Sequence, residues 1–528
     1  MAYFSLHAYD ADVKIPMFRG LNQADINLNP DIRYAAEAVN VETPHGTLQP
    51  QAGLSIIPGG EFEGRVETLA VLHRRWYSGP GSNTWYITAC GGKLYQKQKG
   101  ENTLWDEISL PQSVNAFQSD VWSYVTYEVT TLGVTVDVLL MSNAKDGMIL
   151  ITPPDRPTIL QDLAAYTLEE LGSHTLQEMV SPRWTIQTVN TQGKKFGVIE
   201  QFEERIWGSA IPDEPDMLMY SRPYDPTDWT QAGDDEEPED GAGDILQPSW
   251  DGDRFYAERG FGNQFLAFKK NRIWGVLGVS PGEYTFHEYF GEGTEYFNTI
   301  AVAPERVYMA GRHGLMVFDG MSTTPYAHDQ IEQIWRTVNK NALDQMCAAL
   351  FQQRYYLAFP TGDSPINNAM LVYNFDEGTI LYYKDFYIEA FLSSDEELLA
   401  TSSTLPGQIV RIEYDSWESG KAYGNPCKWM TPWMDFGYEK IQKGGFDLYF
   451  LPEVQDEAVE FTISIETEKK TKTKTYTVLP TDKEHRMKRL HFGGSGRRFR
   501  VIIETAAGVT APWRLLGGLQ LLVETDPD

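Results

Sequence analysis

The sequence predicts an all-β fold: a β-propeller of six or seven blades with short helical insertions, followed by a small C-terminal β-sandwich. Aromatic residues make up 13% of the 528 residues and occur with 45 Gly and 29 Pro, a composition typical of many short strands joined by turns. Seven strand–turn–strand stretches recur at intervals of roughly 40 to 65 residues, as expected of four-stranded blades. They begin at Thr84, Asp137, Arg205, Phe265, Arg306, Arg354 and Leu398.

Residues 1–60 are expected to form an entry segment that contributes to the propeller edge. Residues 30–38 (PDIRYAAEA) have the composition of a short helix, residues 39–43 (VNVET) that of a first strand, and residues 47–50 (TLQP) that of a return strand after a turn. The apolar positions expected to close or cap the propeller are Leu48, Leu54 and Ile56.

The propeller is expected over residues 61–425, with insertions near 155–200 and 230–250. Two stretches break the strand pattern, at 159–180 and 329–346, and both have helix-forming composition. In the second, apolar residues fall on one helical face, which is more often a core contact than a partner site. These residues are Ile331, Ile334, Trp335 and Val338.

The tail, residues 426–528, alternates polar and apolar residues without the blade spacing, which predicts the β-sandwich. Between Lys469 and Arg500 there are eleven basic residues and two acidic ones. This asymmetry predicts a contact face for an acidic neighbour, such as another copy of the chain; solvated strand faces are the alternative. The contact is expected at Lys469, Lys470, Lys472, Lys474, Arg497, Arg498 and Arg500.

An acidic run, GDDEEPEDGAGD, covers residues 233–244 and is expected to be a solvated loop. Carboxylates at this density can hold Ca²⁺, but the alternating ligands and the central glycine of an EF-type loop are absent, so a cation site is the lesser alternative. The loop's carboxylates include Asp234, Asp235, Glu236, Glu237, Glu239 and Asp240.

Reactive motifs are absent from the sequence. It contains no GxSxG, HExxH, CxxC or phosphate-loop pattern, and its nine histidines form no cluster. The three cysteines, Cys90, Cys347 and Cys427, are far apart and odd in number, which predicts folding in a reducing compartment. We therefore expect a protein that is not an enzyme and has no catalytic residue, cofactor or metal.

The charge balance also narrows the function. There are 44 basic and 74 acidic residues, a formal charge of −30, whereas a protein that wraps nucleic acid is expected to be basic. Mean hydropathy is −0.38 and no run approaches 18 apolar residues, so we expect no membrane span. The first residues lack the charged and apolar regions of a secretory signal.

Several short motifs follow one another in a fixed order along the chain. They are NVE at 40–42, GTL at 46–48, GL at 53–54, RIWGSAIPDEPDMLMYSRPYDPTDW at 205–229, FGNQFLAFKKNRIWGVLG at 261–278 and GLMVFDG at 314–320. Their order resembles that in the tail-nozzle and tail-hub propeller proteins of short-tailed bacteriophages, including the tail tubular protein B and packaged-DNA-stabilisation groups. The C-terminal part is similar to the β-sandwich ends of such proteins.

The resemblance implies a structural virion protein. Copies of it would form a ring, expected to hold about six subunits, between portal or adaptor proteins and other tail or fibre proteins. The ring would extend the DNA channel, help to retain the packaged genome, and conduct double-stranded DNA at ejection. Its location would be the phage tail, after folding in the host cytoplasm. A negatively charged wall would repel phosphates, so that DNA passes without tight binding.

Two other functions remain open at this point. A carbohydrate- or receptor-binding propeller would expose aromatic pairs at the blade tops, and the candidates are Trp76, Tyr77, Trp122 and Tyr124. A glycan-cleaving propeller would place two carboxylates across a cleft, but among 74 acidic residues no pair is singled out.

Overall fold

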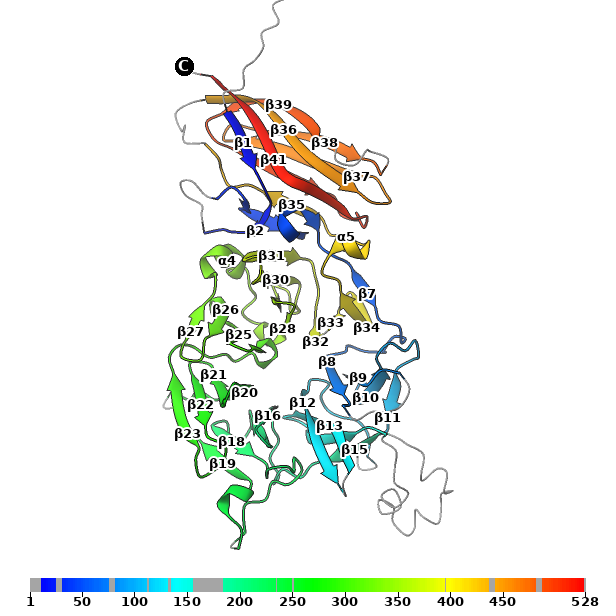
Figure 1. Ribbon diagram of the computed structural model, residues 1–528, viewed down its shortest axis with the longest axis vertical. Helices are drawn as coiled ribbons and strands as arrows, with labels where there is room; N and C mark the ends of the chain where they lie inside the picture. The colour runs from blue at the N-terminus through cyan, green and yellow to red at the C-terminus, as the bar shows by residue number, and fades with distance from the viewer. Residues whose placement is uncertain are drawn as a thin grey trace, which may run out of the picture.

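A computed structural model of the chain shows a ring of β-sheets with a β-sandwich against its rim (Figure 1). The structure describes residues 11–24, 31–75, 81–111, 114–131, 134–154, 184–233, 235–248, 251–394, 396–435, 442–480 and 487–526.

Seven four-stranded antiparallel sheets form the ring, so the predicted propeller is confirmed with seven blades. In six of these sheets all four strands pair in their order along the chain, as in a meander, and in the seventh the first three do. The first strands of neighbouring sheets contact one another around the axis: β12 (Ser123–Thr131) contacts β16 (Val198–Phe202), and β28 (Cys347–Phe351) contacts β32 (Ala390–Ser393). The ring is closed because β32 also contacts β8 (Thr68–His73) of the first blade.

The remaining strands of the first four blades pair in chain order. They are β9 (Thr84–Cys90), β10 (Lys93–Gln98) and β11 (Asp106–Ile108); β13 (Val134–Asn143), β14 (Gly147–Thr152) and β15 (Thr185–Thr188); β17 (Arg205–Ser209), β18 (Met217–Tyr220) and β19 (Gly243–Leu246); and β20 (Phe255–Phe261), β21 (Gln264–Lys269), β22 (Ile273–Leu277) and β23 (Thr285–Tyr289).

The last three blades follow the same pattern, with one exception at the end. Their strands are β24 (Ala301–Ala303), β25 (Arg306–Gly311), β26 (Gly314–Phe318) and β27 (Thr323–Pro325); β29 (Arg354–Phe359), β30 (Ala369–Asn374) and β31 (Thr379–Lys384); and β33 (Leu398–Ser402) and β34 (Leu405–Ile412). The fourth strand of the seventh blade is β7 (Leu54–Ile56), which comes from the N-terminal segment and pairs with β34.

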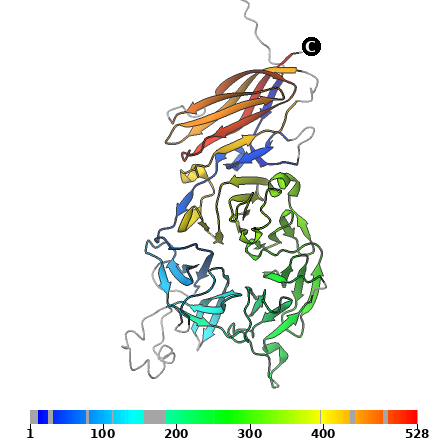
Figure 2. The same ribbon diagram turned by 180° about the vertical axis from the view of Figure 1, so that it is seen from behind.

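Two sheets make the sandwich, in the orders β1-β41-β36-β39 and β38-β37-β40-β35-β4. Most of these strands come from the C-terminal part, but β1 and β4 come from the N-terminal segment. Figure 2 shows β1 in blue beside the red and orange C-terminal strands. The bounds are β1 (Ala11–Ile15), β4 (Glu37–Val39), β35 (Cys427–Met430), β36 (Gln442–Val454), β37 (Val459–Thr467), β38 (Thr471–Val478), β39 (Lys488–Gly496), β40 (Phe499–Thr505) and β41 (Trp513–Asp526).

The N-terminal segment therefore enters both parts of the molecule. Leu54 in β7 pairs with Ile412 of the propeller, whereas the buried Leu48 forms a bridge to Leu515 of the sandwich. The same segment also forms two small two-stranded sheets. In one, β2 (Arg19–Leu21) pairs with β3 (Tyr34–Ala35), and in the other β5 (Val41–Glu42) pairs with β6 (Gln49–Pro50).

The helix predicted over residues 30–38 is wrong within the described part of that stretch. Residues 34–35 form β3 and residues 37–39 form β4, where Ala38 pairs with Trp429 of β35. Helix propensity is a weak preference, and here strand pairing and the burial of both alanines outweigh it.

Helices are few and short in the described residues. The predicted helix after residue 329 is confirmed as α4 (His328–Trp335), and it buries Ile331 and Ile334, but it ends well before residue 346. The helix predicted at 159–180 lies outside the described residues. The other helical turns are α5 (Ser416–Ser419), η1 (Pro44–Gly46), η2 (Pro238–Asp240), η3 (Phe297–Thr299) and η4 (Leu343–Gln345).

One continuous apolar core joins the sandwich to the fifth and sixth blades. At its centre Phe18, which follows β1, packs edge-on against Trp429 of β35, with ring centroids 4.9 Å apart. Both side chains are fully buried, and the Trp429 indole N–H donates to the carbonyl of Arg19. The start and the end of the chain are thus held by the same core.

We expect Phe18→Ala to lower the free energy of unfolding by about 3–5 kcal/mol, because it removes a buried ring from this core. Phe290, which is 81% exposed, provides the matched control: Phe290→Ala is expected to change it by less than about 0.5 kcal/mol. Urea denaturation followed by circular dichroism measures both. Equal effects would contradict a structural role of the N-terminal segment.

Glu258 is a buried carboxyl group on β20, between the third and fourth blades. It is 0% exposed, and the neighbouring Ser209 side chain and backbone offset only part of the cost of burying it. Burial raises the pKa of Glu258 to about 8, and the neighbouring carboxylate of Glu200 adds to the rise. The folded protein therefore favours the protonated acid at neutral pH.

This shift predicts a pH dependence of stability. The unfolded chain loses the proton near pH 4.5 and the folded protein near pH 8, so between these values the free energy of unfolding falls by up to about 1.4 kcal/mol per pH unit. Glu258→Gln removes this loss, so the variant is expected to gain stability relative to wild type as the pH rises from 5 to 8. Thermal denaturation at several pH values measures the difference. The exposed Glu305→Gln is the control and should show no trend; a flat difference for Glu258→Gln would refute the assignment.

Candidate functional site

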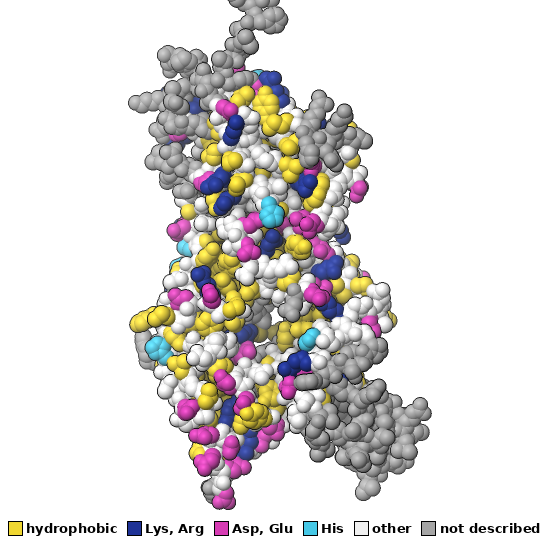
Figure 3. Space-filling view, in the orientation of Figure 1, with side chains coloured by type: hydrophobic (Ala, Val, Ile, Leu, Met, Phe, Trp, Pro, Cys, Tyr) yellow, Lys and Arg dark blue, Asp and Glu magenta, His cyan; other side chains and the backbone are white. Residues whose placement is uncertain are grey.

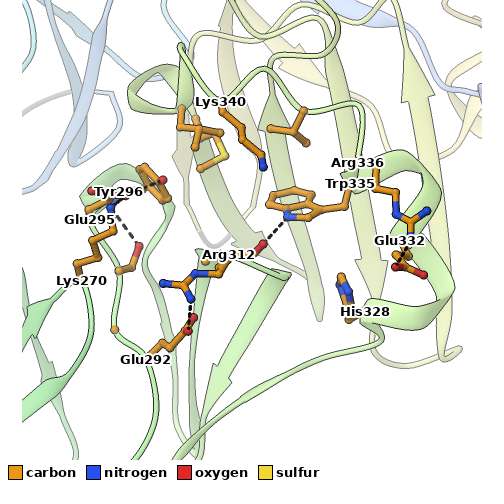
Figure 4. Close-up of a pocket in the computed structure, with 16 residues that line it drawn as sticks. Lys270, Glu292, Glu295, Tyr296, Arg312, His328, Glu332, Trp335, Arg336 and Lys340 are labelled. Carbon is orange, nitrogen blue, oxygen red and sulfur yellow. Dashed lines mark hydrogen bonds and ion pairs between the residues drawn. The ribbon is translucent and has the colours of Figure 1, made fainter.

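A pocket of about 490 Å³ lies beside the fifth blade (Figure 4). Four segments form it: the turn after β21 at Lys270, the connection from the fourth to the fifth blade at 292–296, Gly311 and Arg312 at the end of β25, and the stretch from α4 to Met346. Its volume falls within the range of small-molecule sites.

Three ion pairs surround the pocket. Lys270 Nζ lies 2.8 Å from Glu295 Oε1, which also accepts a hydrogen bond from the Tyr296 hydroxyl at 2.9 Å. Arg312 pairs with Glu292 at 3.4 Å, and Arg336 pairs with Glu332 at 2.6 Å, one turn away in the helical region.

These contacts also set the electrostatics of the pocket. The hydrogen bond to Glu295 raises the pKa of Lys270, so this ammonium stays charged. Burial and the same carboxylate raise the pKa of Tyr296 well above its ordinary value. The three glutamates are thus each matched by one cation.

Trp335 and Lys340 complete the lining. The Trp335 indole N–H donates to the carbonyl of Arg312 at 2.9 Å, so the ring offers only apolar surface to the pocket. Figure 4 shows the ammonium of Lys340 directed into the space beside this ring. The apolar floor is made by Val338, Leu343 and Met346.

The hydroxyl groups that line the pocket are already hydrogen-bonded. Thr294 donates to the carbonyl of Ala310, and Tyr296 donates to Glu295. Among the described residues no group of three His, Cys, Asp or Glu side chains is arranged to hold a metal ion.

The predicted basic residues of the sandwich divide into two places. Lys469, Lys470, Lys472 and Lys474 lie on or just before β38 and are exposed; we call these four the basic edge. The backbone amides of Arg497 and Arg498 donate to the carboxylate of Glu468 at 2.5 and 3.0 Å, which brings both arginines beside the basic edge.

Arg500 lies elsewhere. Its guanidinium pairs with Glu466 at 2.8 Å and lies 4.6 Å from the ring centroid of Trp433. Arg500 and Trp433 line a groove of about 600 Å³ between the sandwich and the propeller. Residues of α4 such as Ile334 line its other side. Arg500 therefore faces the propeller of its own chain.

Strand β38 is an outer strand of its sheet, and this gives the basic edge a structural role. Lys472 and Lys474 pair with Ile465 and Ile463, so they share the inner face of the sheet with these buried residues. Lys474 Nζ lies 5.7 Å from the ring centroid of Phe492 on the opposing sheet. Lysines that point inward on an outer strand hinder the addition of a further strand.

The acidic run lies on the third blade, before β19. We call Asp235, Glu236, Glu237, Glu239 and Asp240 the acidic tip; all five are exposed, and Asp234 lies outside the described residues. Glu236 pairs with Arg222 at 2.6 Å, and this hydrogen bond lowers the pKa of Glu236 to about 2. Glu236 therefore stays ionised throughout the physiological pH range.

Charge is divided unequally between the two parts of the chain. Residues 427–528 contain 15 basic and 15 acidic residues, so the whole formal charge of −30 lies on residues 1–426. Acidic side chains gather over the end of the propeller farthest from the sandwich (Figure 3). The basic edge and the acidic tip lie near opposite ends of the long axis, as the positions of β38 and β19 show (Figure 1).

Sequence reasoning did not find the pocket. Trp335 was assigned to the core face of its helix, and the pocket's charged residues come from four segments that only the fold brings together. Of the aromatic candidates, Trp122 is buried against Phe117, and Tyr124 packs against the same core. Trp76 and Tyr77 lie outside the described residues. One feature of the sequence could have pointed to the pocket: acidic and basic residues flank the single tryptophan, Trp335, in residues 329–346.

Comparison with known proteins gives a distant likeness of fold. No family model matches the chain, and no curated protein matches it. Among solved structures, it is similar to the Pan2 WD40 domain of Neurospora crassa, with 9% identity, a TM-score of 0.35 and coverage of 70% of this chain and 96% of that one. It is also similar to the AfRom2 CNH domain, with 10% identity, a TM-score of 0.37 and coverage of 69% and 100%. In the described residues, no helix has both the length and the apolar character needed to cross a membrane.

Proposed function

We propose that this chain is a structural subunit of a bacteriophage tail, in which about six copies form a ring around the path of double-stranded DNA. The observation that carries the proposal is the division of charge: −30 on residues 1–426 and zero on residues 427–528, with a basic edge on the neutral part. The order of motifs that resembles tail-nozzle and tail-hub propellers supports the same role.

The acidic propeller suits a channel through which DNA moves. A wall of negative charge repels the phosphates, and it makes few of the cation–phosphate contacts that release counterions and hold DNA tightly. DNA then passes along the wall at physiological salt without being retained by it. In this role the ring helps to keep the packaged genome in place by closing the channel sterically, in contact with portal or adaptor proteins on one side and tail or fibre proteins on the other.

The placement of the charged ends supports contacts between copies. The basic edge of one subunit can face the acidic tip of the next, because the two lie near opposite ends of the chain (Figure 1). Such a contact joins two different surfaces, and contacts of this kind close into a ring when the rotation between subunits divides a full turn. The role is structural, and it requires no catalytic residue or cofactor.

Reversing the charge of the basic edge tests the assembly. We expect wild type to assemble at low salt and to dissociate as salt screens the contact, and Lys469→Glu/Lys470→Glu, at the exposed turn before β38, to remain a monomer. Sedimentation velocity at several salt concentrations measures both. The control is Lys145→Glu/Lys384→Glu, which makes the same change of charge at exposed lysines of the propeller and should assemble like wild type. Unchanged assembly of the first variant would contradict the proposed contact.

DNA binding tests the second half of the proposal. We expect no saturable binding of a fluorescent DNA duplex up to about 100 µM protein at physiological salt, because the charge of the propeller opposes it. Fluorescence anisotropy measures the binding. Micromolar affinity that weakens steeply with salt would show a DNA-capturing protein instead.

A further inference from the structure

The pocket beside the fifth blade has one cation more than it has anions. Each of Glu292, Glu295 and Glu332 is paired with its own arginine or lysine. Within the described part of the chain Lys340, which also lines the cavity, forms no ion pair. An ammonium directed into a pocket on a strongly acidic protein attracts an anion that fits that pocket.

The surroundings of Lys340 specify the rest of the ligand. Trp335 offers apolar ring surface, because its N–H is already used by the Arg312 carbonyl. Flat apolar surface of this kind packs against the C–H face of a sugar ring. An ionised carboxylate has about four acceptor positions, so the paired glutamates at the rim keep oxygens that can accept hydrogen bonds from hydroxyl groups.

The same glutamates limit the charge of the ligand. The four cations and three carboxylates that line the pocket leave one net positive charge, which matches a ligand with a single negative charge better than a phosphate dianion. A carboxylate carries one negative charge and matches one ammonium. The cavity of about 490 Å³ is large enough for a small saccharide.

We propose that this pocket binds a saccharide that carries a carboxylate, of the uronic acid class. Lys340 binds the carboxylate, Trp335 packs against the sugar ring, and the oxygens of Glu292 and Glu332 accept hydrogen bonds from the hydroxyl groups. This binding site is independent of the role proposed above for the charged ends, because neither the basic edge nor the acidic tip lines the pocket.

Ligand-observed NMR and calorimetry on the full chain test the proposal with three probes: sodium D-glucuronate, methyl glucoside and glucose 6-phosphate. We expect D-glucuronate to bind at least about tenfold more tightly than either of the others, because only it provides one carboxylate together with the sugar ring. No binding of D-glucuronate at millimolar concentration would overturn the proposal, as would tighter binding of the phosphate ester.

Variants assign the contact to the pocket. Lys340→Ala is expected to weaken D-glucuronate binding about tenfold, and Lys340→Arg to restore most of it, because the arginine keeps the charge. Trp335→Ala should weaken binding of both D-glucuronate and methyl glucoside. The exposed Lys145→Ala is the control and should bind like wild type. Thermal denaturation checks that each variant folds, and full affinity in folded Lys340→Ala would refute the site.

Discussion

The pairing of the first 60 residues with distant parts of the chain is the constraint on which the rest of the structure depends. Strand β7 completes the seventh blade through β34, while β4 and β1 complete the two sheets of the sandwich through β35 and β41. Because one short segment enters both parts, the sandwich cannot separate from the propeller without loss of strands from each. The buried contact of Phe18 with Trp429 adds a shared core at the same junction. The distance between the charged ends of the molecule is thereby fixed.

Because that distance is fixed, the unequal division of charge favours contacts between copies of the chain over contacts within one copy. A flexible tether would let the neutral sandwich fold back onto its own acidic propeller, and the opposite charges would satisfy each other within one subunit. A rigid junction keeps the basic edge away from the acidic tip, so their attraction is available to another copy. The pocket beside the fifth blade is built differently, with its glutamates already neutralised at short range. The surfaces proposed to bind another subunit and the pocket proposed to bind a small ligand thus lie in separate regions of the molecule.

Sequence patterns predicted the repeating parts of this fold well, because each blade is a local meander whose strands and turns are written in consecutive residues. The sandwich strands from β36 onward were predictable from their alternation of polar and apolar residues, although most of them pair with strands that are distant in the sequence. The fate of residues 34–39 was not, since the alanine-rich composition favours a helix and only the distant partner Trp429 makes it a strand. The basic stretch was found from composition, but its separation into the basic edge and Arg500 depends on which face each strand turns outward. The pocket residues, spread from Lys270 to Met346, could not be grouped without the fold.

We propose that copies of this chain form a ring with an axial channel. Electron microscopy of the purified full-length protein at low salt tests it most directly. We expect closed rings in which the sandwich of each subunit meets the propeller of the next and acidic surface faces the channel. A population of single propellers, or rings whose channel is lined by the basic edge, would contradict it.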